Sequence, residues 1–314
     1  IALTLTTAMG VYLGARSEFE KILVLLARVY GLILILCLIT ILITPNYGIY
    51  HTEYGVRELG GIFTNKNSLG SNMFLSFMVW AWAYTSGTFR RSTTLFFLSL
   101  SAILLLFSNS MTSILIFLVI IFAYTMYVIY RYNRYIFFGI ASISMALIVF
   151  FLIYFLIYLA DHSLSDFFIN FLGRDITLSA RTIIWKSVWT DISKMFWFGY
   201  GQDGYWAGTG HSFAFLVHEI DSLALAGAHN GILEVWLNIG LIGVILFLVY
   251  FFLTVARVFN LTLVNRSQTL TIFIILFITA FTAYNFAENL LLRRNDIFWV
   301  LFVAISSYLS PGLD

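Results

Sequence analysis

The sequence predicts an all-α polytopic membrane protein, a bundle of about eight to nine transmembrane helices with one large external loop that contains short helices. Of its 314 residues, 61% are hydrophobic and only 10% are charged, whereas soluble domains carry about 25% charged residues. The apolar residues fall in runs long enough to cross a bilayer, which takes ~20 residues of helix. The charged residues gather in the connections between these runs.

Apolar runs recur along the whole chain. Residues 1–14 look like the end of an apolar segment, so we expect further spans upstream. No charged residue occurs between Ser92 and Tyr130, a stretch that would make a helix of about 58 Å at ~1.5 Å per residue. Because that is too long for one span, the polar turn 108–113 divides it into two. Single spans are predicted at 22–44, 67–89, 135–160, 235–256, 267–290 and 297–310.

These runs divide the chain into three parts. Residues 1–160 are the predicted N-terminal transmembrane helices, with a small external loop at 45–70. Residues 161–231 are a large polar loop, and residues 232–314 are the C-terminal transmembrane helices. The large loop concentrates polar residues in an otherwise apolar chain, so we expect it to be the catalytic part.

Charge separates the two faces of the bundle. Counting spans places the basic residues at 16–21, 90–91, 131–134 and 257–266 on one side, which the positive-inside rule makes cytoplasmic. Every acidic residue except Glu18, Glu20 and Asp314 then falls outside or at the outer boundary, as do all five histidines. We therefore expect the chemistry on the external face. The net charge of +2 argues against a nucleic-acid partner, and the single cysteine excludes a disulfide framework.

Arg181 is the first candidate in the large loop. The pattern predicts a helix from Ala180 to about Phe196 with Ser179 as its N-cap, because apolar residues recur there at helical spacing. Arg181 then lies in the first turn, where a cation opposes the helix dipole. A bound anion would relieve that conflict, since free amides and guanidinium would both point at it. The alternative is an interfacial arginine that touches lipid phosphates.

His229 is the second candidate, just before the span that starts near Ile232. A neutral imidazole could accept a proton from a hydroxyl near pH 7. The alternative is a histidine that caps the helix or lies hydrogen-bonded in a polar pocket. Asn230 is predicted to be the N-cap of the following helix, with substrate contact as the second interpretation. Glu234, one turn further, could orient His229 or take part in capping.

Two smaller groups of polar residues lie at other outer boundaries. Lys66 and Asn67 begin a span, a favourable position for an anion, and Arg57 precedes them in the same loop. An interfacial lysine reaching for water is the alternative for Lys66. The second group is Glu288, Asn289, Arg293 and Arg294, in which pairing of Glu288 with an arginine is expected and substrate contact is the alternative.

Metal and nucleotide sites find little support in the sequence. The glycine-rich stretch 199–206 matches no phosphate-binding loop, although its aromatic residues could stack on sugar rings or lie on the membrane. His211, His218 and His229 follow no known metal-ligand spacing, and no Asp-x-Asp pair occurs. We therefore expect neither a metal nor a cofactor.

Three segments together resemble the O-antigen ligase and polysaccharide polymerase superfamily of bacterial inner-membrane glycosyltransferases. They are Gly61–Gly70, Leu178–Trp185 with Phe198–Gly201, and Ala228–Glu234 with Gly240–Gly243. Their order and their placement on one face make the set fairly specific, and the match spans most of residues 55–305. The closing residues 288–302 look like the exopolysaccharide polymerase branch. Ala180 departs from the glycine of many relatives but still permits the helix to start.

The resemblance implies a GT-C-like, metal-independent and inverting transferase of the inner membrane, with its active site on the periplasmic face. Its donors and acceptors would be undecaprenyl-pyrophosphate-linked oligosaccharides. Arg181 matches the family arginine for the pyrophosphate, and His229 matches the essential loop histidine, which would act as general base. Lys66, Arg57, Arg293 and Arg294 are candidates for a second phosphate contact.

Three functions remain open from the sequence. A polymerase of lipid-linked repeat units is the leading prediction, with a chain-length regulator as a possible partner. A ligase that passes the glycan to the lipid A core is the closest alternative. A transporter of lipid-linked oligosaccharides belongs to another class, and transporters bury ionisable groups near the membrane midplane. The predicted spans are nearly free of such groups.

Overall fold

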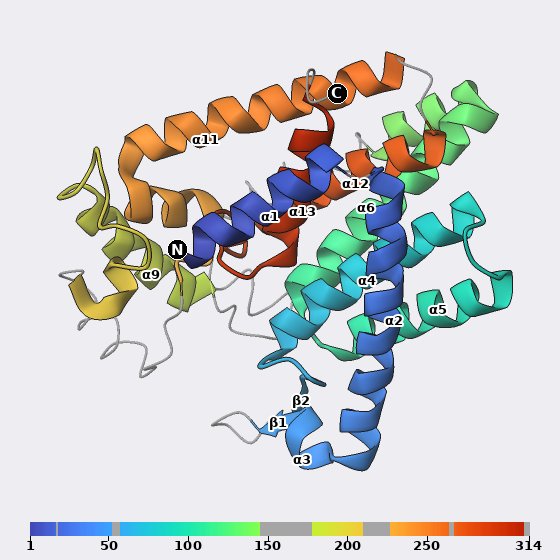
Figure 1. The fold of residues 1–314 in the computed structure, drawn as a ribbon, viewed down its shortest axis with the longest axis horizontal. Coiled ribbons are helices and arrows are strands. Elements are labelled where there is room, and N and C mark those ends of the chain that lie inside the picture. The colour runs from blue at the N-terminus through green and yellow to red at the C-terminus, as the bar shows by residue number, and fades with distance from the viewer. Residues whose placement is uncertain (17, 52–56, 145–177, 210–226, 264–266, 311–314) are drawn as a thin grey trace. The chain divides into compact units, whose positions relative to one another are not determined.

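The computed structural model describes residues 1–16, 18–51, 57–144, 178–209, 227–263 and 267–310 (Figure 1). Most of these residues are helical. The main helices are α1 (Ala2–Arg16), α2 (Phe19–Ile43), α3 (Pro45–Gly48), α4 (Lys66–Ser86), α5 (Arg91–Phe107), α6 (Met111–Tyr132), α9 (Leu178–Ile192), α11 (Gly231–Leu263), α12 (Gln268–Tyr284) and α13 (Ile297–Tyr308). A π-helical turn, η1, covers Tyr205–Thr209.

The apolar helices make this a multi-pass membrane protein. α2, α6 and α11 are long and apolar enough to cross a bilayer, and α1, α5, α12 and α13 are shorter apolar helices. The predicted polar turn at 108–113 is confirmed, since α5 ends at Phe107 and α6 begins at Met111. Of the predicted span 135–160, only its first residues are described, and 134–144 are helical. The total number of spans stays a prediction.

One short sheet accompanies the helices in the described residues. β1 (Ile49–His51) pairs antiparallel with β2 (Arg57–Leu59), with Ile49 opposite Leu59. The all-α prediction missed this hairpin, which lies within the predicted external loop 45–70. Its strands are only three residues long, too short for a clear alternating pattern in the sequence.

The chain forms two compact units. The first unit comprises residues 1–120, 230–232 and 243–314, and the second comprises 121–229 and 233–242. In the first unit α1 packs along α13, and α4 packs along α5 and α12. Gly10 and Gly14 permit the close contact of α1 with α13, since a Cβ at Gly14 would collide with the carbonyl oxygen of Ala304. Small residues four apart are a common device for close helix packing in membranes.

α11 is two helical segments joined at Gly240. Gly240 has φ 69° and ψ −176°, which breaks the helical path. The amide of Leu241 instead donates to the carbonyl of Phe196 at 2.9 Å, so the turn that follows α9 caps the second segment of α11. From Leu241 to Leu263 that segment measures about 34 Å at ~1.5 Å per residue, close to the ~30 Å of a hydrocarbon core. The predicted span 235–256 is therefore interrupted, and residues 231–239 precede the kink.

Candidate functional site

α9 provides the framework of the second unit. Ile184, Val188 and Ile192 are buried along one face of this helix, where they pack with Tyr205, Ala228 and Leu237. The predicted helix is thus confirmed, but two details differ. Ser179 lies inside the helix and is not its N-cap, and α9 ends at Ile192 instead of near Phe196. The chain turns after Ile192, and the carbonyl oxygens of Phe196 and Trp197 then accept from amides of α11.

A hydrogen bond joins α9 to the loop that carries His229. Trp185 donates its indole N–H to the carbonyl oxygen of Ala228 at 2.8 Å. Arg181 lies four positions before Trp185, and residues so spaced share one face of a helix. The backbone of Arg181 is therefore one turn from the residue that holds the neighbour of His229. The Arg181 side chain lies outside the described part of the structure.

The loop at His229 is held in an unusual backbone conformation. His229 has φ 48°, in the left-handed region that residues other than glycine seldom adopt. Its side chain is half-buried and its Nδ1 atom is shielded from solvent. Next to it, Ala228 is fully buried. The predicted cap is confirmed, since Asn230 Oδ1 accepts from the amide of Ile232 at 3.1 Å.

Glu234 connects three parts of the second unit. Its side chain is buried, with 5% exposure. Oε2 accepts from the amide of Ala228 at 2.8 Å, and Oε1 accepts from the indole N–H of Trp206 at 2.8 Å. The sequence suggested that Glu234 could orient His229 but did not indicate the part of Trp206.

The glycine-rich stretch 199–206 is anchored on α11. The amide of Tyr200 donates to the carbonyl of Leu237 at 2.7 Å, and the amide of Asp203 donates to Asn238 Oδ1 at 3.0 Å. Tyr205 is buried and donates its hydroxyl to Asp191 at 3.1 Å. Burial and the Asp191 carboxylate raise the pKa of Tyr205, so its phenol stays protonated and keeps this bond. The glycine-rich stretch is therefore bonded to both α9 and α11, which the sequence did not predict.

Polar residues also meet in the first unit, at the start of α4. Asn65 caps this helix by accepting from the amide of Ser68 at 2.8 Å, which puts Lys66 in its first turn as predicted. Lys66 forms an ion pair with Glu58 at 2.6 Å. Asn67 donates to Glu288 Oε1 at 3.2 Å, so the start of α4 contacts the closing segment. The side chain of Arg57 lies outside the described residues.

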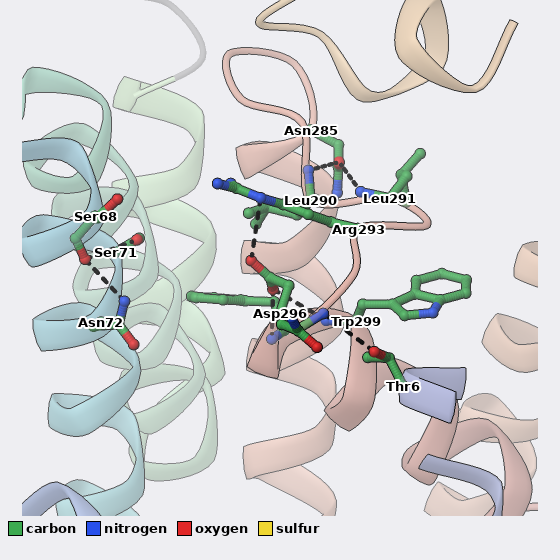
Figure 2. Close-up of polar contacts among 12 residues, drawn as sticks. Thr6, Ser68, Ser71, Asn72, Asn285, Leu290, Leu291, Arg293, Asp296 and Trp299 are labelled. Carbon is green, nitrogen blue, oxygen red and sulfur yellow. Dashed lines mark hydrogen bonds and ion pairs between the residues drawn. The ribbon is translucent and has the colours of Figure 1, made fainter. Parts of the chain in front are cut away.

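The segment 285–296 is organised by two side chains (Figure 2). Asn285 Oδ1 accepts from the amides of Leu290 and Leu291, at 3.0 and 3.1 Å, and its backbone carbonyl accepts from the amide of Gly231 at 2.8 Å. Asp296 accepts from the amide of Phe298 at 2.8 Å and so caps α13.

Two contacts of the charged residues in this segment are shown. Arg293 lies 3.9 Å from Asp296, and Glu288 accepts from Asn67, while the pairing of Glu288 with an arginine stays a prediction. Burial raises the pKa of Asp296, an effect that Arg293 opposes. The sequence did not predict the contact of Glu288 with Asn67, because the two residues are far apart along the chain.

A metal site would need several His, Cys, Asp or Glu side chains close together. Within the described ranges no three His, Cys, Asp or Glu side chains gather as a metal site. His162, His211 and His218, together with Glu219 and Asp221, lie outside those ranges. The prediction of a metal-free site therefore stays a prediction.

One family model matches a continuous part of the chain that includes α9 and the loop at His229. Residues 96–248 match the family model described as O-antigen ligase. The chain carries an O-antigen ligase family domain. This confirms the resemblance found in the sequence, and the domain includes α9, His229 and Glu234 but excludes Lys66 and the segment 285–296. No curated protein matches the chain.

Trp185 is the residue whose role sequence reasoning missed in the O-antigen ligase domain. Its spacing of four from Arg181 is visible in the sequence, but tryptophans in such a helix are also typical of a helix at the membrane interface. In the structure Trp185 is partly buried and its indole N–H is bonded within the protein, whereas Trp189 is 56% exposed. A partner for the indole N–H cannot be inferred from helical spacing alone.

Proposed function

We propose that this protein is an inner-membrane glycosyltransferase that polymerises polyprenyl-pyrophosphate-linked oligosaccharide repeat units. The reaction takes place on the external face of the membrane and needs no metal. The products are exopolysaccharide or O-antigen chains. The O-antigen ligase domain supports the broad class of this proposal, a membrane enzyme that transfers glycans.

The observation that carries the proposal is the bond from Trp185 to Ala228. It ties the helix of Arg181 to the residue before His229 at 2.8 Å. A cation and an imidazole held on one framework can serve one substrate headgroup. Preorganised groups of this kind stabilise developing charge without rearranging during the reaction.

The chemistry divides between these two residues. The oxygen of an acceptor hydroxyl attacks the anomeric carbon of the donor while the bond from that carbon to the pyrophosphate breaks. His229 takes the proton from the hydroxyl, and Arg181 binds the pyrophosphate as it leaves with its charge. One displacement inverts the configuration at the anomeric carbon.

Further polar and charged residues are proposed as substrate contacts. They are Lys66, Asn67, Arg57, Glu288, Arg293 and Arg294, and Asn230 is added to them as the cap beside His229. Lys66 and Arg293 each have a carboxylate partner, Glu58 and Asp296. A phosphate would therefore share or displace that carboxylate on binding.

A ligase is the second candidate, because the matching family is described as O-antigen ligase. A ligase passes the finished glycan to a lipid A core sugar, so it differs only in the acceptor. Analysis of lipid-linked glycans in a deletion strain separates the two. Loss of long chains on the carrier supports the polymerase, and accumulation of long carrier-linked chains supports the ligase.

The direct test uses the purified protein with lipid-linked single repeat units in detergent. We expect products with two or more repeats, resolved on a gel. A transporter of these lipids would give no longer product in a mixture without two compartments. Unchanged substrate with a folded protein would contradict the proposal.

A further inference from the structure

We infer that Glu234 is a positioning residue for His229 and that it acts through the backbone of Ala228, while its other carboxylate oxygen accepts from the indole of Trp206. This inference rests on the proposed function, because it needs His229 to be the general base. Glu234 itself would not touch the substrate. Its bond to Ala228 adds to the bond that Trp185 makes with the same residue.

Both backbone groups of Ala228 are held by side chains. Glu234 accepts the N–H at 2.8 Å, and Trp185 donates to the carbonyl at 2.8 Å. Ala228 is fully buried, so no solvent competes for these bonds. The two peptide groups that flank Ala228 are therefore both fixed, the first by Glu234 of α11 and the second, which leads into His229, by Trp185 of α9.

The fixed peptide matters because His229 has an unfavourable backbone conformation. Its φ of 48° costs free energy for a residue with a Cβ, and such a conformation persists only where the surroundings impose it. Glu234 supplies part of that constraint from one turn along α11. Loosening it would let His229 relax towards a commoner conformation and move its imidazole.

Only a carboxylate fits the donors that converge on Glu234, which are the N–H groups of Trp206 and Ala228 together with the side chain of Asn238. Oε1 faces the N–H of Trp206 and Oε2 faces the N–H of Ala228, so both positions must accept. A glutamine of the same shape offers one accepting oxygen and one donating amino group. Whichever way its amide turns, the amino group meets an N–H.

This conflict gives a test by double substitution. Glu234→Gln is expected to lower kcat roughly tenfold to a hundredfold, the loss that one unsatisfied buried donor implies. The affinity for lipid-linked single repeat units should change by less than about threefold, because α9 and Arg181 are untouched. Trp206→Phe removes the competing donor and should by itself cost less than about threefold, since Glu234 still holds Ala228.

The double variant decides the mechanism. In Glu234→Gln with Trp206→Phe, the amide oxygen is free to accept from Ala228, so kcat should recover towards that of Trp206→Phe alone. If kcat of the double variant fell by the product of the two single-variant losses, the inference would be overturned. Wild-type turnover in Glu234→Gln would overturn it as well.

Controls separate positioning from stability. Asp191→Asn makes the same change at another buried carboxylate of the unit, which contacts Tyr205 and Lys194. It should lower the unfolding midpoint in detergent while kcat stays within about twofold of wild type. A drop in kcat as large as that of Glu234→Gln would mean general damage and would contradict the inference.

A second variant covers the case in which Glu234→Gln does not fold. Trp185→Phe frees the carbonyl of Ala228 and should also lower kcat more than substrate affinity. His229→Ala is assayed alongside. If His229→Ala is active, the proposed function fails; if it is inactive while Glu234→Gln and Trp185→Phe match wild type, only this inference fails.

Discussion

At the residue scale the proposed chemistry rests on two side chains, and these need different properties. His229 must exchange a proton near neutral pH, which imidazole does better than any other side chain. Arg181 must present a flat pair of donors to phosphate oxygens and stay charged throughout. The structure fixes the backbone beside both, through Trp185 and Glu234. A substitution can therefore remove the chemistry and leave this framework in place.

His229→Ala tests the general base. Chain lengthening should fall by about a hundredfold or more, since a positioned base contributes ~10²–10⁴ in rate. The variant should insert and fold normally, as judged by size-exclusion chromatography. Added imidazole should restore part of the activity by entering the space left by the side chain. Products of wild-type length without imidazole would refute the base assignment.

Arg181→Lys tests the pyrophosphate contact. We expect severe loss of lengthening and weaker donor binding, because a point charge does not reproduce a two-pronged phosphate contact. Lys186→Gln is the control, since it removes an exposed positive charge from the same helix. The control should retain near-normal activity. Wild-type donor affinity and turnover in Arg181→Lys would count against the assignment.

At the element scale the kink of α11 decides where the membrane segment begins. Gly240 adopts φ 69°, and a Cβ there would collide with the carbonyl of Trp197. The turn 196–199 could not otherwise approach the helix so that the carbonyl oxygens of Phe196 and Trp197 accept from the amides of Leu241 and Ile242. The short segment with Glu234 is thus set apart from the segment that crosses the bilayer.

Gly240→Ala should destabilise the second unit. Backbone strain of this kind costs about 1–3 kcal/mol, and the collision with Trp197 adds to it. Thermal unfolding in detergent should show a clear drop in midpoint, accompanied by loss of chain lengthening. Gly139→Ala is the matched control, because a Cβ there meets open space. Equal midpoints for the two variants would contradict the role given to the kink.

Sequence patterns predicted the elements better than their connections. The runs at 22–44 and 67–89 became α2 and α4 because length and hydropathy alone determine such helices. The end of α9 and the break in α11 are accompanied by hydrogen bonds between segments more than 40 residues apart, such as the bond from the amide of Leu241 to the carbonyl of Phe196. No local pattern encodes such bonds. The same limit applies to Asn67 and Glu288, which meet only after folding.

At the scale of the whole molecule, apolar helices confine the titratable residues mostly to the connections between them. The O-antigen ligase domain at 96–248 includes both proposed catalytic residues, although the sequence alone already pointed to them. The functional class was predictable because the motifs kept their order along the chain. The acceptor could not be predicted from the sequence, since a polymerase and a ligase would share the same donor chemistry.

Chelation tests the metal-free reaction of the whole enzyme. Chain lengthening by purified protein should survive excess EDTA, because guanidinium groups can stabilise the leaving pyrophosphate without a metal. Rates with and without chelator should agree within about twofold, a difference of only ~0.4 kcal/mol in the barrier. Activity that is lost with EDTA and returns only with a divalent ion would overturn this part of the mechanism.

The most direct test of the central claim is a density map of the protein in lipid nanodiscs with undecaprenyl pyrophosphate bound. The proposal predicts the pyrophosphate within hydrogen-bond distance of the Arg181 guanidinium, with the His229 imidazole lining the same cavity on the external face. A headgroup bound away from both residues, or a map that puts them on opposite sides of the bilayer, would contradict it.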